Sequence, residues 1–92
     1  MEILVNRCFG GFGLSNEALE LYKSKKGITD DIYYGNIERN DPALIESVKE
    51  IGIKKSGTWL SELEIVTIPD DIEWTIEEYD GKEWVAEKHR TW

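Results

Sequence analysis

The stretch from Arg7 to Ser15 (R-C-F-G-G-F-G-L-S) carries the residue types best suited to holding a ligand. An apolar strand is expected to end there and a helix to begin just after it. Glycine removes the side chain that would keep a bound group away, and backbone N–H groups before a helix are suited to anions. We therefore expect Gly10, Gly11 and Gly13 to form a small anion-binding concavity of adjacent N–H groups.

Side chains next to these glycines would complete such a site. Arg7 would add positive charge, and the Ser15 hydroxyl lies at the start of the expected helix. The ring of Phe9 or of Phe12 would stack on a nucleotide base. An alternative stays open, in which the loop is only a tight crossover from strand to helix and both phenylalanines belong to the core.

The last six residues (E-K-H-R-T-W) place cations and an aromatic ring together. Arg90 would form a two-pronged contact with a phosphate, Trp92 would stack on a base, and His89 would lie beside them. The alternative is a terminal strand whose cations balance acidic neighbours while Trp92 closes the core.

Other chemistries find less support. The glycine spacing does not match the dinucleotide fingerprint G-x-G-x-x-G, and no Lys-Ser or Lys-Thr follows as in a phosphate-binding P-loop. Cys8 as a nucleophile with His89 as an acid or base is a minor alternative. Neither a catalytic triad nor a metal-ligand set follows from the spacing, so we expect a non-enzymatic protein without a cofactor.

The chain is acidic, with 19 Asp and Glu against 11 Lys and Arg and a net charge of −8. This balance argues against a nucleic-acid partner, because phosphate neutralisation needs clustered cations. Residues 62–87 hold ten acidic residues and a single lysine, Lys82, which we interpret as a solvated sheet face. Alternatively, these acidic strands and exposed Trp84 and Tyr79 would dock onto a basic protein.

The lack of a disulfide, a leader and a membrane span in the sequence favours a cytoplasmic location. Cys8 is the single cysteine, so no internal disulfide can form. No basic and apolar leader precedes Ile3, and no apolar run approaches the length of a membrane span. We therefore expect a cytoplasmic protein with no membrane partner.

The first half should supply one strand and two helices. Residues 2–8 contain the run Ile-Leu-Val, which is typical of a strand that is covered on both sides or lies centrally, and we expect a middle strand. Ser15 should cap a helix that ends at Gly27, and Asp41 followed by proline should start a second helix that ends at Gly52. The connection over residues 27–40 is long, and connections of this length are often functional.

The last third should be β-structure. Residues 63–68 and 72–79 read as strands, and the Asp80-Gly81 dipeptide predicts a two-residue hairpin turn. That turn places Ile76 opposite Val85 and Glu78 opposite Glu83. We expect the two carboxylates to be exposed at the hairpin tip, where like charges cost little, with neutralisation by a cation as the alternative.

Together these elements predict a single α+β domain over residues 1–92, with the order β-α-α-β-β-β. Two helices would cover one face of a mostly antiparallel sheet of about four strands. A homo-oligomer would allow two shallow surfaces to form one enclosed pocket.

Three strings resemble those of a family of short, uncharacterised bacteriophage proteins: N-R-C-F-G-G-F-G-L-S (6–15), D-P-A-L (41–44) and I-E-E-Y-D-G-K-E-W-V-A-E-K-H-R-T-W (76–92). The resemblance covers both ends and the middle of the chain. Small phage proteins often counter host defence, some by sequestering nucleotide-derived signals and others by blocking a defence protein. By this analogy, the hypothesis is a phage accessory protein that binds a small anionic, nucleotide-like ligand, with inhibition of a host protein as the alternative.

Overall fold

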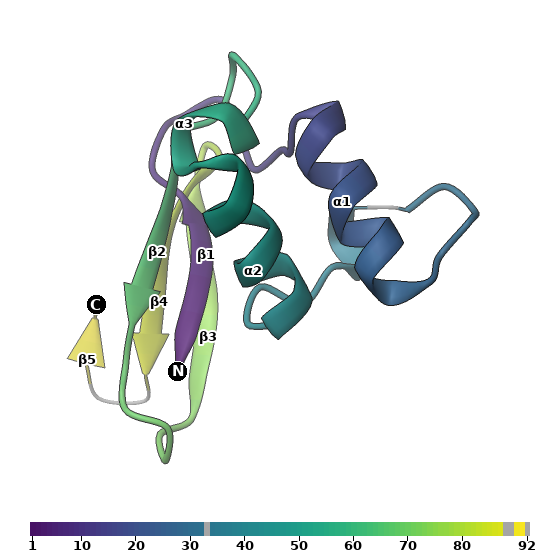
Figure 1. Cartoon of the computed structure of the whole chain (residues 1–92). Coiled ribbons are helices and arrows are strands. Elements are labelled where there is room, and N and C mark those ends of the chain that lie inside the picture. The colour runs from purple at the N-terminus through teal and green to yellow at the C-terminus, as the bar shows by residue number, and fades with distance from the viewer. Residues whose placement is uncertain (33, 88–89, 92) are drawn as a thin grey trace.

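The computed structural model describes residues 1–32, 34–87 and 90–91, with side chains through residue 87. Its elements follow the chain in the order β1 (Glu2–Asn6), α1 (Asn16–Lys26), a 3₁₀ turn η1 (Tyr34–Asn36), α2 (Pro42–Ile51), α3 (Ile53–Ser56), β2 (Leu63–Thr67), β3 (Trp74–Tyr79), β4 (Lys82–Glu87) and β5 (Arg90–Thr91) (Figure 1). The expected α+β class is confirmed.

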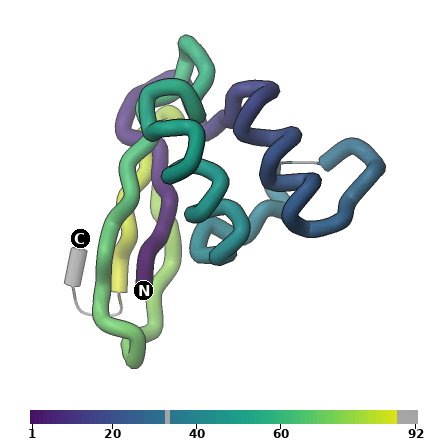
Figure 2. Tube along the Cα trace, in the orientation of Figure 1, coloured from purple at the N-terminus to yellow at the C-terminus, as the bar shows by residue number. Residues whose placement is uncertain are grey.

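The described elements form three layers rather than helices on a single sheet (Figures 1 and 2). The antiparallel pair β1–β2 lies between the helices and an antiparallel sheet with the strand order β3-β4-β5. Two apolar clusters fill the two interfaces. Leu4 and Leu63 face the helices, whereas Ile3 and Val85 belong to the cluster between the sheets.

Strand β1 is covered on both faces but has only one hydrogen-bonded strand neighbour among the described residues. Its side chains alternate between the layers, because Ile3 and Val5 contact the β3–β4 side and Leu4 contacts the helices. The Ile-Leu-Val run therefore reflects coverage by two layers. The expected coverage on both sides is confirmed, whereas the expectation of a middle strand is wrong, and the strand ends at Asn6.

The second edge of β1 is covered by polar groups in place of a strand. The N–H of Leu4 donates to the carbonyl of Arg39 (2.9 Å), and the N–H of Asn6 donates to the carboxylate of Glu83 (2.8 Å). Arg39 holds that carboxylate with two hydrogen bonds, of 2.6 and 2.8 Å. These contacts protect an edge that would otherwise expose unpaired backbone groups.

Glu83 is 6% exposed, so the expectation that it would be solvated at the hairpin tip is wrong. The reason is the edge of β1, which requires an acceptor at this place, and Arg39, which neutralises the buried charge. The register itself is confirmed, because Glu78 pairs with Glu83 and Ile76 pairs with Val85. The turn also matches, with positive φ at both central residues (50° and 91°).

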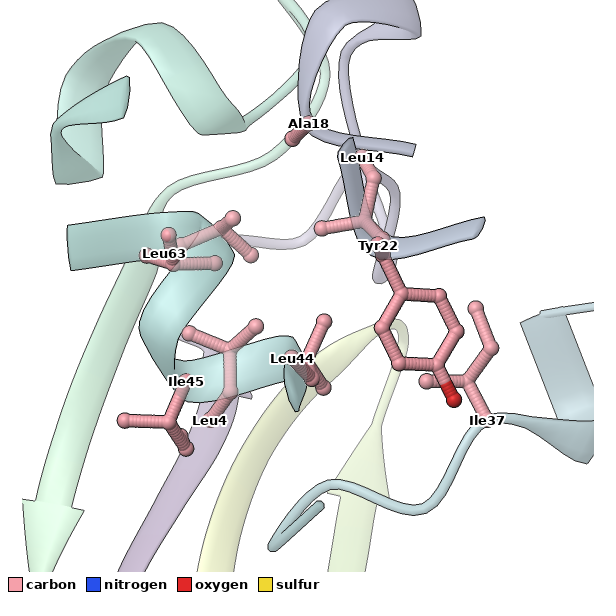
Figure 3. Packing of buried hydrophobic residues seen from close by; sticks show 9 residues of the cluster. Leu4, Leu14, Ala18, Tyr22, Ile37, Leu44, Ile45 and Leu63 are labelled. Atoms are coloured by element: carbon pink, nitrogen blue, oxygen red, sulfur yellow. The ribbon is translucent and has the colours of Figure 1, made fainter. Parts of the chain in front are cut away.

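Both long helices begin and end where the sequence predicts. The Ser15 hydroxyl accepts a hydrogen bond from the N–H of Ala18 (3.2 Å), and Gly27 ends α1 in the left-handed conformation. Asp41 caps α2, and Gly52 ends it. Their apolar stripes meet Leu4 and Leu63 in one cluster, where Leu44 and Tyr22 are central (Figure 3).

Asp41 also joins the two helices. Its carboxylate contacts the ammonium group of Lys26 (2.9 Å) and the hydroxyl of Tyr22 (3.1 Å). Burial opposes ionisation of Asp41, but hydrogen bonds from Lys26, from the N–H of Ala43 and from Tyr22 outweigh it and hold the carboxyl pKa below its ordinary value. Burial and the hydrogen bond to Asp41 together raise the pKa of Tyr22.

The lowered pKa makes the ionised Asp41 stabilising at neutral pH. A carboxyl with a depressed pKa in the folded state contributes stability above its unfolded pKa of about 3.9, and that contribution is lost as the pH falls below this value. Asp41→Asn keeps a good helix cap but cannot titrate. In urea unfolding between pH 7 and pH 2.5, we expect the stability difference between wild type and this variant to shrink towards low pH. A difference independent of pH would contradict the assignment.

Candidate binding surface

The glycine-rich loop (residues 8–13) is held between two other loops of the same chain. A Cβ atom added to Gly10 would lie 1.6 Å from the carbonyl oxygen of Leu60. A Cβ atom added to Gly81, in the β3–β4 turn, would lie 2.5 Å from the nitrogen of Gly11. Close approach of three backbone segments therefore explains glycine at positions 10 and 81, and it supports the interpretation of the loop as a crossover.

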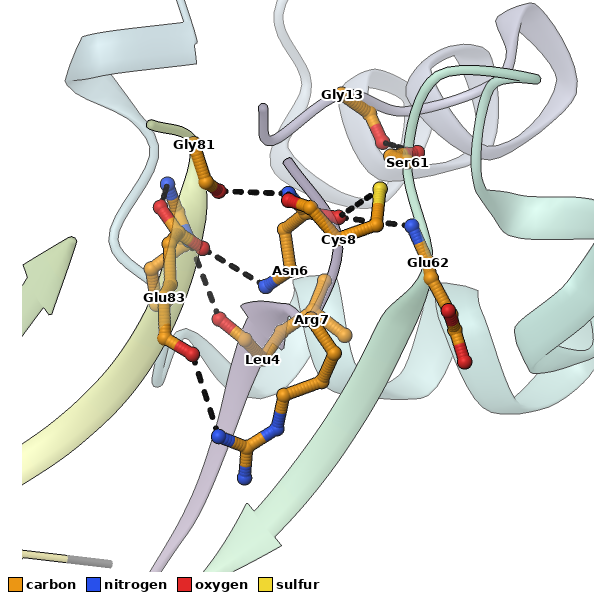
Figure 4. A network of polar contacts seen from close by, with 10 residues as sticks. Leu4, Asn6, Arg7, Cys8, Gly13, Ser61, Glu62, Gly81 and Glu83 are labelled. Atoms are coloured by element: carbon orange, nitrogen blue, oxygen red, sulfur yellow. Dashed lines mark hydrogen bonds and ion pairs between the residues drawn. The ribbon is translucent and has the colours of Figure 1, made fainter. Parts of the chain in front are cut away.

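Asn6 fixes this meeting point from inside (Figure 4). Its buried side-chain amide donates to the carbonyls of Cys8 and Gly81, both at 2.7 Å, and its oxygen accepts from the N–H of Glu62 (2.8 Å). Sequence reasoning did not identify Asn6. The available signal was a polar residue at the end of an apolar strand. An amide buried at such a position needs several hydrogen-bond partners, so it indicates a place where other segments meet the strand.

Arg7 does not direct its charge to the glycines. Its Nε donates to the exposed carboxylate of Glu64 (2.7 Å), and one terminal nitrogen donates to the carbonyl of Glu83 (3.2 Å). The guanidinium thus bridges β2 and β4, so its charge is already partnered by Glu64.

The two phenylalanines lie in different environments. Phe12 is half-buried, with the guanidinium carbon of Arg39 3.5 Å from its ring centroid and the ring of Tyr34 edge-on to it. Phe9 is 64% exposed, and the nearest cation is the ammonium of Lys82, 5.7 Å from its ring. Of the two rings expected to stack on a base, Phe12 is already packed against protein groups, whereas Phe9 is exposed.

The backbone N–H groups of residues 9–13 make no hydrogen bond to any residue that the structure describes. The Ser15 hydroxyl, in contrast, is engaged as the cap of α1. Anion binding by these N–H groups stays a prediction.

The C-terminal residues meet the sheet at its other end. β5 pairs with the last residues of β4, with Arg90 beside Glu87, whereas the glycine loop contacts the start of β4 (Figure 1). The five residue steps from Lys82 to Glu87 span about 17 Å of strand. One chain therefore does not bring the backbone of Arg90 to the glycine loop. The side chain of Arg90, together with His89 and Trp92, lies outside the described residues.

Exposed apolar side chains gather at the end of the molecule where the three loops meet. Trp59 is 92% exposed, Tyr79 68%, Phe9 64% and Leu60 47%. We call these four residues the aromatic tip. The segments that carry them meet, because Gly10 approaches the carbonyl of Leu60, and the Phe9 ring lies 5.7 Å from the ammonium of Lys82, which pairs with Tyr79.

Sequence reasoning singled out Phe9 and Tyr79 but missed Trp59 and Leu60. The available signal was a Trp-Leu pair within a short polar turn, residues 57–61. Such a turn has no packed layer that could bury these side chains, so the pair indicates apolar exposure. Trp84, which we expected to be exposed, is half-buried.

Exposed carboxylates adjoin the tip along the chain. Glu78 and Asp80 flank Tyr79, Glu62 follows Leu60 by two positions, and the ammonium of Lys82 lies 5.7 Å from the ring of Phe9. The surface therefore combines exposed rings with a negative potential, which is complementary to an apolar surface bordered by cations.

The Cys8 thiol contacts the carbonyl of Leu60 at 3.0 Å, and its proposed partner His89 is outside the described part of the chain. Over residues 1–32, 34–87 and 90–91, no group of three His, Cys, Asp or Glu residues could hold a metal ion. No helix in these ranges is long and apolar enough to cross a membrane.

Comparison of the chain with protein-family models, curated proteins and solved structures gives no match.

Proposed function

We propose that this protein is a non-enzymatic binding module that docks its aromatic tip onto a basic protein. The observation that carries the proposal is the exposure of Trp59 (92%), next to Leu60 in the chain, on one of three segments that meet at one end of the domain and that also carry exposed Phe9 and Tyr79. Clustered apolar exposure of this kind marks interaction sites, and Trp and Tyr are enriched among the residues that dominate binding energy.

The negative charge of the chain favours a basic partner. A net charge of −8, with carboxylates around the tip, disfavours acidic partners and speeds association with basic ones. The resemblance to short phage proteins supplies the setting, in which the partner is a bacterial host protein, the module acts in the host cytoplasm, and binding inhibits that protein.

A small anionic, nucleotide-like ligand is the second candidate. The backbone N–H groups of residues 9–13, which have no partner among the described residues, are the observation in its favour. Such a ligand would find few side-chain contacts. Arg7 is paired with Glu64, Phe12 packs against Arg39, and the C-terminal strand lies at the other end of β4. The aromatic tip therefore carries the better-supported function.

The test compares proteins captured from a bacterial lysate by wild type and by Trp59→Ser. Because Trp59 is almost fully exposed, its replacement should leave the melting temperature unchanged within about 2 °C. Ile53→Ser, an exposed apolar residue outside the tip, is the matched control. We expect one basic protein to be retained stoichiometrically by wild type and Ile53→Ser and to be lost with Trp59→Ser.

Retention should also fall as salt is raised from 50 to 500 mM, because screening weakens the attraction between opposite charges. The proposal is overturned if wild type retains no basic protein beyond what Trp59→Ser retains. Co-purification of a small anion that Trp59→Ser still binds would favour the second candidate instead.

A further inference from the structure

The β1–β2 pair has one edge that the fold closes and one that it leaves open. The closed edge belongs to β1, where Arg39 and Glu83 accept the outward N–H groups of Leu4 and Asn6. The open edge belongs to β2, because no strand within residues 1–32, 34–87 and 90–91 pairs with it on that side.

The register shows which groups point outward from β2. Arg7 donates to the carbonyl of Glu62, and hydrogen-bonded pairs alternate along an antiparallel ladder. The backbone groups of Leu63, Ile65 and Thr67 therefore point away from β1. Their N–H groups make no hydrogen bond to any described residue outside the strand pair.

The side chains along β2 favour pairing with another strand. Ile65 and Val66 are half-buried, Thr67 is exposed, and all three are β-branched. The Glu64 carboxylate is paired with Arg7. The outer strand β3 differs, because consecutive exposed carboxylates of the kind found at positions 77 and 78 protect an edge against pairing.

The position and charge of this edge connect it to the aromatic tip. β2 begins three residues after Leu60, so a strand added to β2 would end beside the tip. Exposed carboxylates lie at both ends of the strand, Glu62 before it and Asp71 after it. A second copy of this chain would bring another net charge of −8 to the same edge, whereas a basic segment would be attracted.

We propose that a basic, extended segment of the partner adds to β2 as a further strand, with hydrogen bonds to the backbone of Leu63, Ile65 and Thr67. This proposal rests on the proposed function, which supplies the basic partner, and adds the way in which that partner is held. Strand addition obtains affinity from main-chain hydrogen bonds and selectivity from alternate side chains.

The direct test uses the synthetic peptide acetyl-Lys-Val-Thr-Val-Thr-Val-Lys-amide and ¹⁵N-labelled protein. We expect binding to slow hydrogen exchange at the N–H groups of Leu63, Ile65 and Thr67 and to leave those of Glu64 and Val66 unchanged. A peptide with N-methylated valines, which cannot donate those hydrogen bonds, should not bind. Equal effects from both peptides, or none from either, would overturn strand addition.

Thr67→Pro removes one outward N–H without removing a bond to β1, and Thr67→Val keeps that N–H. We expect Thr67→Pro to weaken peptide binding about tenfold, as loss of one hydrogen bond implies, and Thr67→Val to change it less than about twofold. A circular dichroism spectrum and melting curve like those of wild type establish that each variant is folded.

The same variants separate the two proposals in the lysate experiment. Loss of the captured protein with both Trp59→Ser and Thr67→Pro supports strand addition. Normal capture by Thr67→Pro, with loss by Trp59→Ser, overturns strand addition and leaves the aromatic tip as the binding surface. A dimer of the free protein that dissociates in Thr67→Pro, measured by sedimentation, would assign the edge to a second copy and also overturn strand addition.

Discussion

Arg39→Met should lower the free energy of unfolding by about 3–5 kcal/mol, the usual cost of leaving one partner of a buried ion pair alone. Arg39 holds both carboxylate oxygens of Glu83, at 2.6 and 2.8 Å, and Glu83 is 6% exposed. The variant leaves this carboxylate buried without its cation. It also removes the guanidinium from the face of Phe12.

Urea unfolding followed by circular dichroism measures this loss. The matched control is Glu64→Gln, which breaks the ion pair of Arg7 with an exposed carboxylate and should cost less than about 1 kcal/mol. Native domains have a total stability of about 5–15 kcal/mol, so Arg39→Met should lose a large fraction of the stability of the protein. Equal stability of the two variants would contradict the role of Arg39 in closing the edge of β1.

Gly10→Ala should destabilise the protein by about 3 kcal/mol, the upper part of the range for inserting an atom into close-packed structure. The added Cβ would lie 1.6 Å from the carbonyl oxygen of Leu60, and both groups are backbone, so neither can rotate away. Thermal unfolding measures the effect.

Gly11→Ala is the matched control for Gly10→Ala. A Cβ atom at Gly11 meets nothing within 4 Å, although φ there is +91°. The control therefore carries only the strain of positive φ, about 1–2 kcal/mol. If Gly10→Ala were no less stable than Gly11→Ala, the glycine loop would not be fixed against Leu60, and the anionic-ligand function would regain support.

Local signals explain the part of the fold that the sequence predicts. Ser15 and Asp41 begin helices by accepting nearby N–H groups, and the Asp80-Gly81 pair sets the hairpin register. Each of these features depends on residues at most a few positions apart. Such interactions are visible in the sequence because the partners are adjacent.

Interactions between distant residues explain what could not be predicted. From its place next to the hairpin turn, Glu83 is expected to be exposed. In the fold it accepts a hydrogen bond from the N–H of Asn6 in β1, which lies 77 positions earlier in the chain. Gly10 likewise resembles a ligand-binding glycine until Leu60 is placed against it. Glycine tolerates a close approach of any group, so its presence alone does not distinguish a ligand from another segment of the chain.

The sequence indicates only part of the aromatic tip, because local signals mark some of its residues and contacts between distant segments bring the rest. Phe9 and Tyr79 stand next to turn signals, which indicate exposure, but only the meeting of three segments in the fold brings their part of the chain to the same end of the molecule as the loop of Trp59. That meeting depends on residues far apart in the chain, so the sequence does not indicate it.

The most direct measurement is isothermal titration calorimetry of the captured basic protein with wild type, Trp59→Ser and Ile53→Ser. A residue that dominates an interface contributes about 2 kcal/mol or more, so we predict that Trp59→Ser binds at least about 30-fold more weakly. Ile53→Ser should bind within about threefold of wild type, because such side chains at most add complementarity. Binding by Trp59→Ser within threefold of wild type would contradict the docking function of the aromatic tip.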